Sequence, residues 1–200
     1  MIDQQTATSR SRTNGRATRE KILQAAREII IEKGTDCLSI DRVIKYAGIS
    51  KGAFMYHFPT RQSLIEALVS EYAQHLEKVQ KTLEAQFQHT TSPMLAAYGQ
   101  WYKDFTTGEI DQGSSPLLAL SLASRDNRQL MQPVRDWYRN HCDRLKTQGC
   151  GPAKAFVVNL AYDALFFHHL FGIDVLTKEE KEMIIHTLND LVAKTDHENE

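Results

Sequence analysis

The stretch "AGISKGAFMYHF", residues 47–58, predicts two short helices separated by a tight turn. Ala47 and Gly48 form the expected bend, and Ser50 is a suitable N-cap for the helix that follows. That helix must end before Pro59, because proline disfavours helical backbone in the residue that precedes it. The sequence around residue 50 therefore predicts a helix-turn-helix arrangement.

A longer helix is predicted before this pair, over residues 17–33, with Gly34 as a left-handed stop. Ser39 can then cap the short helix that precedes the turn. Apolar residues recur through both helices at the three- and four-residue spacing of an amphipathic helix. They are Ile22, Ala25, Ala26, Ile29 and Ile30 in the first helix, and Ile40, Val43 and Ile44 in the second.

The composition of the helix after the turn favours contact with DNA, whose major groove is wide enough to admit a helix. Lys51, Tyr56 and His57 supply donors for the phosphates that flank such a groove. Gly52 and Ala53 permit a close approach of the backbone. These residue types together predict a helix that lies against a nucleic acid.

Phe54 and Phe58 lie four residues apart and are expected to face inward onto the first helix. Met55 and Tyr56 are then expected to point outward. The alternative interpretation is a small packing element of three helices, which gives the outward Met55 and Tyr56 no role.

Charge is divided unevenly along the chain. Residues 1–63 hold eleven Lys and Arg against six Asp and Glu, a balance of +5, whereas residues 64–200 carry −6. A basic N-terminal third is typical of a segment that faces nucleic acid. Residues 1–16 lack apolar periodicity and are predicted to form a disordered basic arm, either a solvated tail or an arm that follows DNA phosphates or the minor groove.

The remainder of the chain shows helical patterns and no strand pattern. Thr60 is expected to cap a long connecting helix that extends to about residue 88. The predicted fold is therefore all-α, with a three-helix helix-turn-helix domain over residues 17–63 and a larger helical bundle over residues 64–200. Further helices are expected at residues 93–106, 115–124, 127–147, 152–171 and 177–194, with a kink or break at Pro133.

Two segments, "REKILQAAREIIIEKG" at residues 19–34 and "SKGAFMYHFPTRQSLIEAL" at residues 50–68, carry a specific resemblance. Their helix lengths, the turn glycine, "SKG", "HF" and "LI" all fall in the register of one family. Residues 17–68 resemble the DNA-binding domain of the TetR family of bacterial transcriptional regulators. The resemblance implies a C-terminal domain for dimerisation and ligand binding, and three partners: a double-stranded DNA operator, a small-molecule inducer and a second copy of the chain.

The chain departs from the family pattern at three positions. Leu38 stands where the family usually has Thr, so Ser39 must serve as the cap, and Thr35 stands where an aromatic residue is frequent. Met55 stands where the family commonly has Tyr, with Tyr56 next to it. Residue pattern and resemblance together give the expected DNA contacts as Ser39, Ser50, Lys51, Gly52, Ala53, Met55, Tyr56, His57 and Arg61.

The expected function is that of a dimeric, ligand-responsive regulator. A two-fold dimer contacts two symmetric half-sites, so the operator should be a pseudo-palindrome. Repression and release by an inducer are implied by the resemblance. The alternative function is a helical ligand-binding or protein-interaction module with weak or lost operator binding, for which Leu38 and Met55 are the hints.

The helix over residues 152–171 is apolar over more of its circumference than a surface helix needs. It is either the core helix of a monomer or, as the resemblance implies, a dimer helix that pairs with its copy and with the final helix. The expected dimer contacts are Phe156, Leu160, Asp163, Phe167, Leu170, Ile184 and Leu188.

Aromatic side chains recur on several helices of the C-terminal part. They can line a pocket for a flat or hydrophobic compound, or simply pack in the core. The candidate ligand-binding residues are Tyr98, Trp101, Tyr102, Phe105, Trp137, Tyr138, His141, Tyr162 and Phe166.

No metal site, cofactor or enzymatic activity is expected. The adjacent His168 and His169 diverge by about 100° on a helix, so they cannot chelate one ion together. The chain contains no nucleophile elbow, phosphate loop or zinc-protease spacing. Three cysteines without CxxC spacing fit a reduced, cytoplasmic protein, and no stretch has the roughly 18 apolar residues that a membrane span needs.

Overall fold

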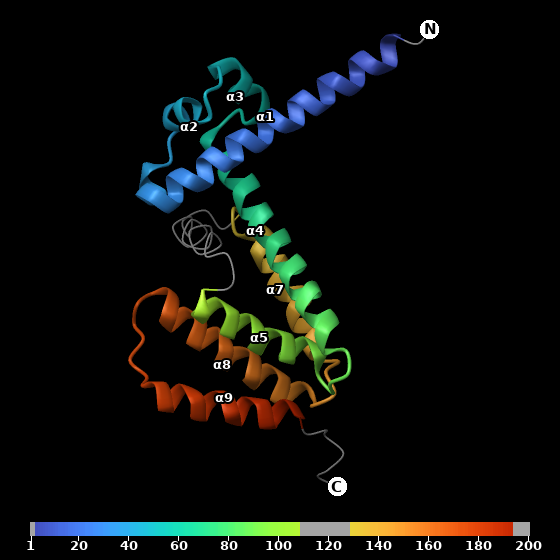
Figure 1. Cartoon of the computed structure of the whole chain (residues 1–200), viewed down its shortest axis with the longest axis vertical. Helices are drawn as coiled ribbons and strands as arrows, with labels where there is room; N and C mark the ends of the chain where they lie inside the picture. Colours follow the sequence, from blue (N-terminus) through green and yellow to red (C-terminus); the bar gives the residue numbers. More distant parts are fainter. Residues whose placement is uncertain (1–2, 109–128, 194–200) are drawn as a thin grey trace. The chain divides into compact units, whose positions relative to one another are not determined.

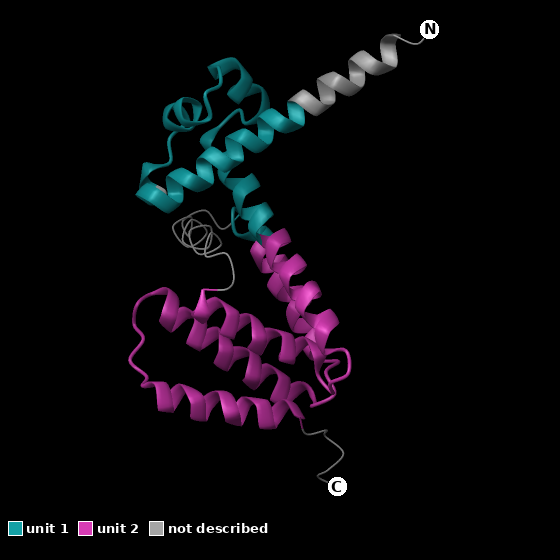
Figure 2. Ribbon diagram, viewed as in Figure 1, with its two compact units in different colours: residues 1–72, 113–133 teal, residues 73–112, 134–200 magenta. Residues whose placement is uncertain are grey.

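The computed structural model describes residues 3–108 and 129–193, and all regular structure in these residues is helical (Figure 1). The predicted all-α class is confirmed. Two compact units divide the described chain (Figure 2). Unit 1 contains residues 3–72 and 129–133, and unit 2 contains residues 73–108 and 134–193.

Helix α1 spans Asp3–Lys33 and ends at Gly34, whose φ of 81° lies in the left-handed region. The sequence predicted a start near residue 17 and a disordered arm before it. That prediction is wrong from Asp3 onward. A helix that has already formed extends at little cost, and the residues before position 17 include no proline to stop it.

Two short helices follow the 3₁₀ turn η1 (Thr35–Cys37): α2 (Ile40–Ala47) and α3 (Lys51–His57). The predicted caps are confirmed. Ser39 Oγ accepts a hydrogen bond from the backbone N–H of Arg42 at 3.4 Å, and Ser50 Oγ accepts one from Ala53 at 3.1 Å. Gly48, with a φ of 62°, ends α2 in the left-handed conformation that makes the turn.

Helix α4 (Arg61–Glu84) runs from unit 1 into unit 2. Its start is capped by Thr60, whose Oγ1 accepts a hydrogen bond from the backbone N–H of Ser63 at 3.0 Å. Glu71 accepts a hydrogen bond from Arg27 of α1 at 2.6 Å, so the first part of α4 belongs with unit 1. The boundary between the units follows Tyr72, whereas the sequence placed it after residue 63.

The core of unit 1 lies beneath α2 and α3. Phe54 and Phe58 are both buried, as predicted, with their ring centroids 6.0 Å apart. Leu38 is also buried, so this departure from the family pattern has a packing role. The other fully buried side chains come from α1, α2 and α4 and include Ile22, Leu23, Ala26, Ile29, Val43, Leu64, Leu68 and Val69.

Unit 2 contains the end of α4, η2 (Ala85–Phe87) and four more helices. They are α5 (Pro93–Thr107), α7 (Gln132–Leu145, within unit 2 from Val134), α8 (Pro152–Leu170) and α9 (Lys178–Ala193). Figure 1 shows α5, α8 and α9 side by side, and each of the three contacts the other two.

Two sequence-based expectations concern the segment before α7. The helix expected at residues 115–124 lies outside the described residues. Helix α7 begins at Gln132, not at residue 127, and Pro133 stands in its first turn without kinking it. A proline is tolerated there because the first N–H groups of a helix have no intrahelical partner.

Candidate functional site

Helix α3 presents a row of exposed side chains. Tyr56 is 82% exposed and Met55 is 39% exposed, while Lys51 is also exposed and His57 is half-buried. The Tyr56 ring meets the His57 ring edge-on at a centroid distance of 5.0 Å. Because Phe54 anchors the opposite side of this short helix, the predicted outward direction of Met55 and Tyr56 is confirmed.

Gly52 lies on the exposed side of α3, and the chain itself does not require a glycine there. A Cβ built on Gly52 would meet only Ser50 Oγ, at 4.0 Å. A glycine inside a helix costs about 0.5–1 kcal/mol relative to alanine. The absence of a side chain therefore fits a demand from outside the chain, such as a phosphate backbone that approaches closely.

Three of the expected DNA contacts have structural roles in the free chain. The hydroxyl oxygens of Ser39 and Ser50 cap α2 and α3. Arg61 Nε donates to the backbone carbonyl of Leu38 at 2.8 Å and so ties the start of α4 to the entry of α2. Sequence reasoning did not find this role of Arg61, because the two residues lie far apart in the chain.

A network of charged side chains from α1 and α4 lies next to Phe58, the residue that follows α3. The guanidinium of Arg19 lies 5.4 Å from the centroid of the Phe58 ring, and its Nη1 lies 3.8 Å from Glu71. Arg27 pairs with Glu71 and with Glu20, both at 2.6 Å. Burial raises the pKa of Glu71 despite these two arginines. Phe58, at the end of the helix-turn-helix, is thus connected through Arg19 to Glu71 of α4.

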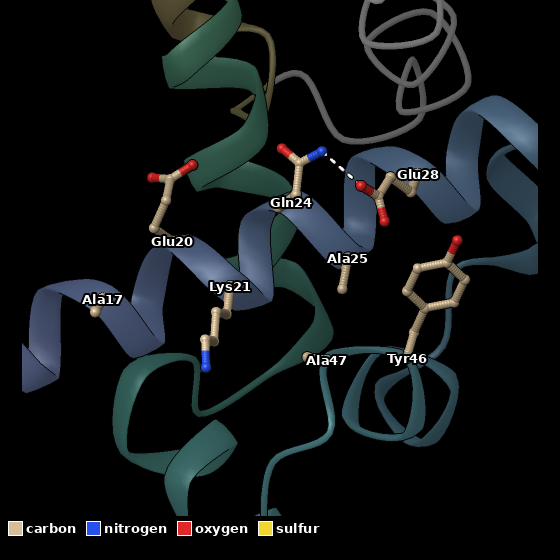
Figure 3. A pocket seen from close by; sticks show the side chains of 8 residues that line it. All are labelled: Ala17, Glu20, Lys21, Gln24, Ala25, Glu28, Tyr46 and Ala47. Carbon is tan, nitrogen blue, oxygen red and sulfur yellow. Dashed lines mark hydrogen bonds between the residues drawn. The ribbon is translucent and has the colours of Figure 1, made fainter.

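A groove of about 560 Å³ lies between α1 and α2 in unit 1 (Figure 3). Its walls include Glu20, Gln24 and Glu28, so it is poorly suited to bind phosphate. At this side Tyr46 donates to Glu32 at 2.9 Å, a bond that raises the pKa of Tyr46. The groove is therefore distinct from the exposed side chains of α3, none of which lines it.

Unit 2 contains a chain of buried polar side chains from four helices. His141 Nδ1 lies 3.1 Å from Gln80 Oε1, and His141 Nε2 lies 2.5 Å from Asn159 Oδ1. Asn159 donates to Asp163 at 3.0 Å, and the Tyr98 hydroxyl also donates to Asp163. This polar chain of side chains connects α4, α7, α8 and α5, and all of its members are buried.

Burial sets the protonation of this polar chain. It lowers the pKa of His141, although the Asn159 bond acts in the opposite sense, and it raises the pKa of Asp163, although both hydrogen bonds to Asp163 oppose that rise. His141 is therefore neutral at physiological pH, with one ring nitrogen as donor and the other as acceptor. Gln80 Nε2 has no hydrogen-bond partner among the described residues. If the Gln80 side-chain amide were rotated by 180°, Nε2 would donate to the accepting ring nitrogen of His141.

The stability of the chain should fall as the pH drops below 6.5, in part because of His141. The pKa of His141 in the folded chain lies below its ordinary value of 6.5, so the unfolded chain takes up the proton first. The stabilising contribution of neutral His141 is complete above pH 6.5 and decreases as the pH is lowered.

Urea unfolding as a function of pH tests this point with a His141→Gln variant, whose amide keeps a donor and an acceptor. We expect the variant to lose less stability on acidification than the wild type. Asp163 acts in the opposite sense, since its raised pKa favours the folded state at low pH, but it is present in both proteins. Identical pH dependence of the two proteins would contradict the prediction.

Most of the aromatic residues proposed from the sequence form one cluster in unit 2. The Trp101 ring lies 4.9 Å from Phe166 and 5.5 Å from Tyr98, and the Tyr102 ring lies 5.7 Å from Tyr162. Phe105 packs on Phe166 at 4.8 Å. Trp137 joins the cluster through His141 at 5.0 Å, and the Tyr138 ring meets the Trp137 ring edge-on at 4.9 Å.

Burial within this cluster is high. Tyr98, Tyr102, Phe105, His141, Tyr162 and Phe166 are all buried, and Trp101, Trp137 and Tyr138 are half-buried. Burial raises the pKa of Tyr162 to about 12, so its hydroxyl is a hydrogen-bond donor at all physiological pH values. The cluster combines aromatic faces with the polar chain that ends at Tyr98 and Asp163.

The predicted dimer contacts divide into three groups by their burial. Asp163 and Leu188 are buried within unit 2, where Asp163 accepts hydrogen bonds from Tyr98 and Asn159. Leu160 is 63% exposed, as a contact with a second chain requires. Phe156, Phe167, Leu170 and Ile184 are half-buried.

Sequence reasoning missed two exposed apolar residues that accompany Leu160. Val157 of α8 and Phe171, which directly follows α8, are each 56% exposed. The spacing of residues 157, 160, 164, 167 and 171 alternates three and four residues, which is the signature of a helix-pairing seam. That spacing could have identified the seam from the sequence.

Residues 3–108 and 129–193 contain no cluster of three His, Cys, Asp or Glu side chains that could hold a metal ion. No helix in the described part of the chain is long and apolar enough to cross a membrane.

Comparison with known proteins agrees with this architecture in both parts of the chain. Residues 22–68 match the family profile described as "Bacterial regulatory proteins, tetR family", and residues 97–193 match the "Tetracyclin repressor-like, C-terminal domain". The HTH-type transcriptional regulator YvdT of Bacillus subtilis strain 168 is 45% identical over 56 residues, which are 28% of this chain and 29% of that protein. The match thus spans less than a third of the curated relative's length.

Solved structures share the fold over nearly the whole chain. A transcriptional regulator from Streptomyces coelicolor A3(2) aligns with a TM-score of 0.69 at 18% identity, over 88% of this chain and 99% of that chain. The multidrug binding protein EbrR, complexed with malachite green, aligns with a TM-score of 0.62 at 21% identity, over 86% of this chain and 96% of that chain. With both profile matches in chain order and this fold, the chain belongs to the TetR family of bacterial regulatory proteins.

Proposed function

We propose that this chain is a dimeric transcriptional repressor that binds a pseudo-palindromic operator through α3 and is released by a small hydrophobic or aromatic inducer. The observation that carries the proposal is the outward face of α3. Tyr56 and Met55 are exposed on a helix whose opposite face is buried through Phe54. Such a function places the chain in the cytoplasm, where operator DNA lies.

The alternative, a module with weak or lost operator binding, rests on Leu38 and Met55. Leu38 is buried in the core of unit 1, so packing explains its presence. Met55 is exposed, and apolar side chains contact the thymine methyl group in the major groove. Neither substitution therefore argues against DNA binding.

The exposed seam on α8 supports the dimer. Val157, Leu160 and Phe171 are more than half exposed, and Phe167 stacks on Phe171 with ring centroids 6.0 Å apart. Contiguous apolar surface of this kind marks an interaction site. A second copy of α8 is the proposed cover, because its seam has the same spacing and a two-fold axis brings like surfaces together.

The aromatic cluster of unit 2 supports a flat, hydrophobic inducer. EbrR, which shares the fold, was crystallised with the aromatic dye malachite green. Among the described residues, Asp163 accepts hydrogen bonds only from the neutral groups of Tyr98 and Asn159. A buried carboxylate without a cationic partner favours a ligand that brings a positive charge into the cluster.

Helix α4 is the proposed route of induction, because it is continuous between the two units. Within unit 2, Gln80 of α4 contacts His141, and within unit 1, Glu71 of α4 pairs with Arg27 and Arg19. A ligand that displaces His141 would change the setting of α4 and with it the spacing of the two α3 helices. Induction further requires that the ligand bind the two conformations unequally.

Selection of bound duplexes from a random DNA pool at near-physiological salt tests the proposal. We expect enrichment of an inverted repeat with half-sites about one helical turn, or a multiple of it, apart. Cationic and neutral aromatic dyes are then titrated against the selected operator, and at least one cationic dye should release the protein. If the dye-free protein enriches no DNA sequence, the alternative function, a module with weak or lost operator binding, would be favoured instead.

Gly52→Ala should separate folding from operator binding. We expect the variant to be as stable as the wild type or more stable by about 0.5–1 kcal/mol, because alanine favours the helix and the site has room for a Cβ. Operator affinity should nevertheless fall, since the new methyl group would meet the DNA backbone. Thermal unfolding and fluorescence anisotropy measure the two quantities.

The opposite substitution at an exposed position away from α3, Ala153→Gly in the first turn of α8, serves as a control for small changes of helix propensity. Unchanged operator affinity in Gly52→Ala would remove Gly52 from the interface.

A further inference from the structure

Two buried donor nitrogens beside His141 have no hydrogen-bond partner among the described residues. They are the indole nitrogen Nε1 of Trp137 on α7 and the amide nitrogen Nε2 of Gln80 on α4. The Trp137 ring lies 5.0 Å from the His141 ring, and Gln80 Oε1 lies 3.1 Å from His141 Nδ1. Two unpartnered polar groups therefore lie next to one buried histidine of unit 2.

Unpartnered polar groups in such surroundings are costly. Gln80 is only 7% exposed, and Nε1 of Trp137 is buried although the side chain as a whole is half-buried. A buried donor without an acceptor loses the hydrogen bond that water gives it in the unfolded chain. Because nearly all buried polar groups in folded proteins are paired, these two favour a partner from outside the chain.

The free end of the Gln80 amide is a donor or an acceptor according to its orientation. Neutral His141 donates from one ring nitrogen and accepts at the other, so Gln80 presents either Oε1 or Nε2 to His141 Nδ1. A hydroxyl group both donates and accepts, so it suits the free end of this amide in either orientation. A hydroxyl oxygen also accepts from the indole N–H of Trp137.

These unpartnered groups lie at the opposite end of the polar chain from its carboxylate. His141 faces Gln80 through Nδ1 and Asn159 through Nε2, which are different edges of its ring. Asn159 in turn donates to Asp163, which also accepts from Tyr98. The polar chain thus offers a carboxylate at one end and unpartnered groups at the other, so a ligand with two different polar groups fits it best.

We propose that the inducer is a flat aromatic cation that also carries a hydroxyl group, and that this hydroxyl binds to Trp137 Nε1 and to the free end of the Gln80 amide. This inference rests on the proposed binding of a cationic aromatic inducer in unit 2 and adds the second polar group of that inducer. Asp163 attracts the positive charge, whereas Trp137 and Gln80 select among cations by the hydroxyl group. A site built for a hydroxyl discriminates strongly, because a ligand without one leaves the polar groups of the site unpaired.

Two matched cations test the hydroxyl subsite directly. They are the N-methyl styrylpyridinium cation and its para-hydroxy derivative, which have the same charge and nearly the same shape. Isothermal titration calorimetry measures their binding to the full chain in the absence of DNA. We expect the hydroxylated cation to bind the wild type about tenfold more tightly, or by a larger factor.

Trp137→Phe should remove most of this preference, because phenylalanine keeps an aromatic ring but has no N–H. Gln80→Leu should reduce the preference as well. The control is Trp101→Phe, the same substitution within the aromatic cluster, at a tryptophan whose indole nitrogen is not one of the buried unpartnered atoms. The control should keep the wild-type ratio of the two affinities.

Use of the affinity ratio separates the subsite from general damage to the protein. A change of fold or packing alters the binding of both cations, so it largely cancels in their ratio for any one variant. Circular dichroism and thermal unfolding establish that each variant is folded before the two cations are compared.

Equal affinity of the two cations for the wild type would overturn the hydroxyl subsite and leave the cationic inducer intact. A hydrogen bond within the chain, from Trp137 to the rotated amide of Gln80, would give that result. A preference that neither Trp137→Phe nor Gln80→Leu reduces would overturn the assignment to these residues. If neither cation binds, the cationic inducer fails together with the subsite, while the DNA selection still tests operator binding through α3 on its own.

Discussion

Phe54→Ala should lower the free energy of unfolding by about 3–5 kcal/mol, the usual cost of removing a fully buried phenylalanine side chain from a packed core. Operator binding should be lost with it, because Phe54 holds the buried side of α3. The Phe58 ring, 6.0 Å away, and Arg19 upon it would lose their packing partner. Urea unfolding and anisotropy with the selected operator measure the two effects.

Tyr56→Ala is the matched comparison, since it removes a large aromatic side chain two residues further along the same helix. Its side chain is 82% exposed, so stability should change by less than about 0.5 kcal/mol. Operator affinity should still fall, and base preference can relax with it. A variant at Phe54 as stable as the wild type, or a Tyr56 variant with full affinity, would contradict the division of α3 into an anchoring and a contacting side.

Leu160→Asp should convert the proposed dimer into monomers. Pairing of α8 with its copy would bury two carboxylates in an apolar seam, at a cost of at least about 3 kcal/mol, or roughly a hundredfold in the dimer dissociation constant. Operator affinity should fall in parallel, because a monomer contacts a single half-site. Analytical ultracentrifugation and anisotropy test both consequences.

Val175→Asp is the control for this substitution. Val175 is the more exposed residue, at 82%, but it lies in the loop between α8 and α9 and outside the seam spacing. It should leave both the oligomeric state and operator affinity unchanged. A Leu160→Asp protein that remains dimeric would remove the α8 seam from the interface.

The helix-turn-helix could be predicted because its signals are local. Ser39, Gly48 and Ser50 act on backbone groups within a few residues, and the structure shows each of them doing so. The inward side of α3 also follows from periodicity, since Phe54 and Phe58 are four residues apart. The length of α1 was missed because a polar segment can be helical when it extends an existing helix, as it does here from Asp3.

The C-terminal unit was predicted less completely. The aromatic residues were grouped correctly, because large apolar side chains on adjacent helices converge in a core. The hydrogen bonds of Asp163 were not predicted, because its spacing with Leu160 and Phe167 does not reveal that Tyr98 and Asn159 are within hydrogen-bonding reach. Tyr98 and Asp163 are 65 residues apart in the chain.

The sequence by itself determined the all-α class, the caps and turn of the helix-turn-helix, the inward and outward sides of α3 and the basic character of the N-terminal third. All of these depend on interactions within a few residues or on composition. Only the tertiary structure decided that Arg61 braces Leu38, that Arg19 supports Phe58, that His141 and Asp163 share one buried polar chain, and that Gly15 lies beside His57. These contacts join residues distant in sequence, and helix packing alone determines which of them meet.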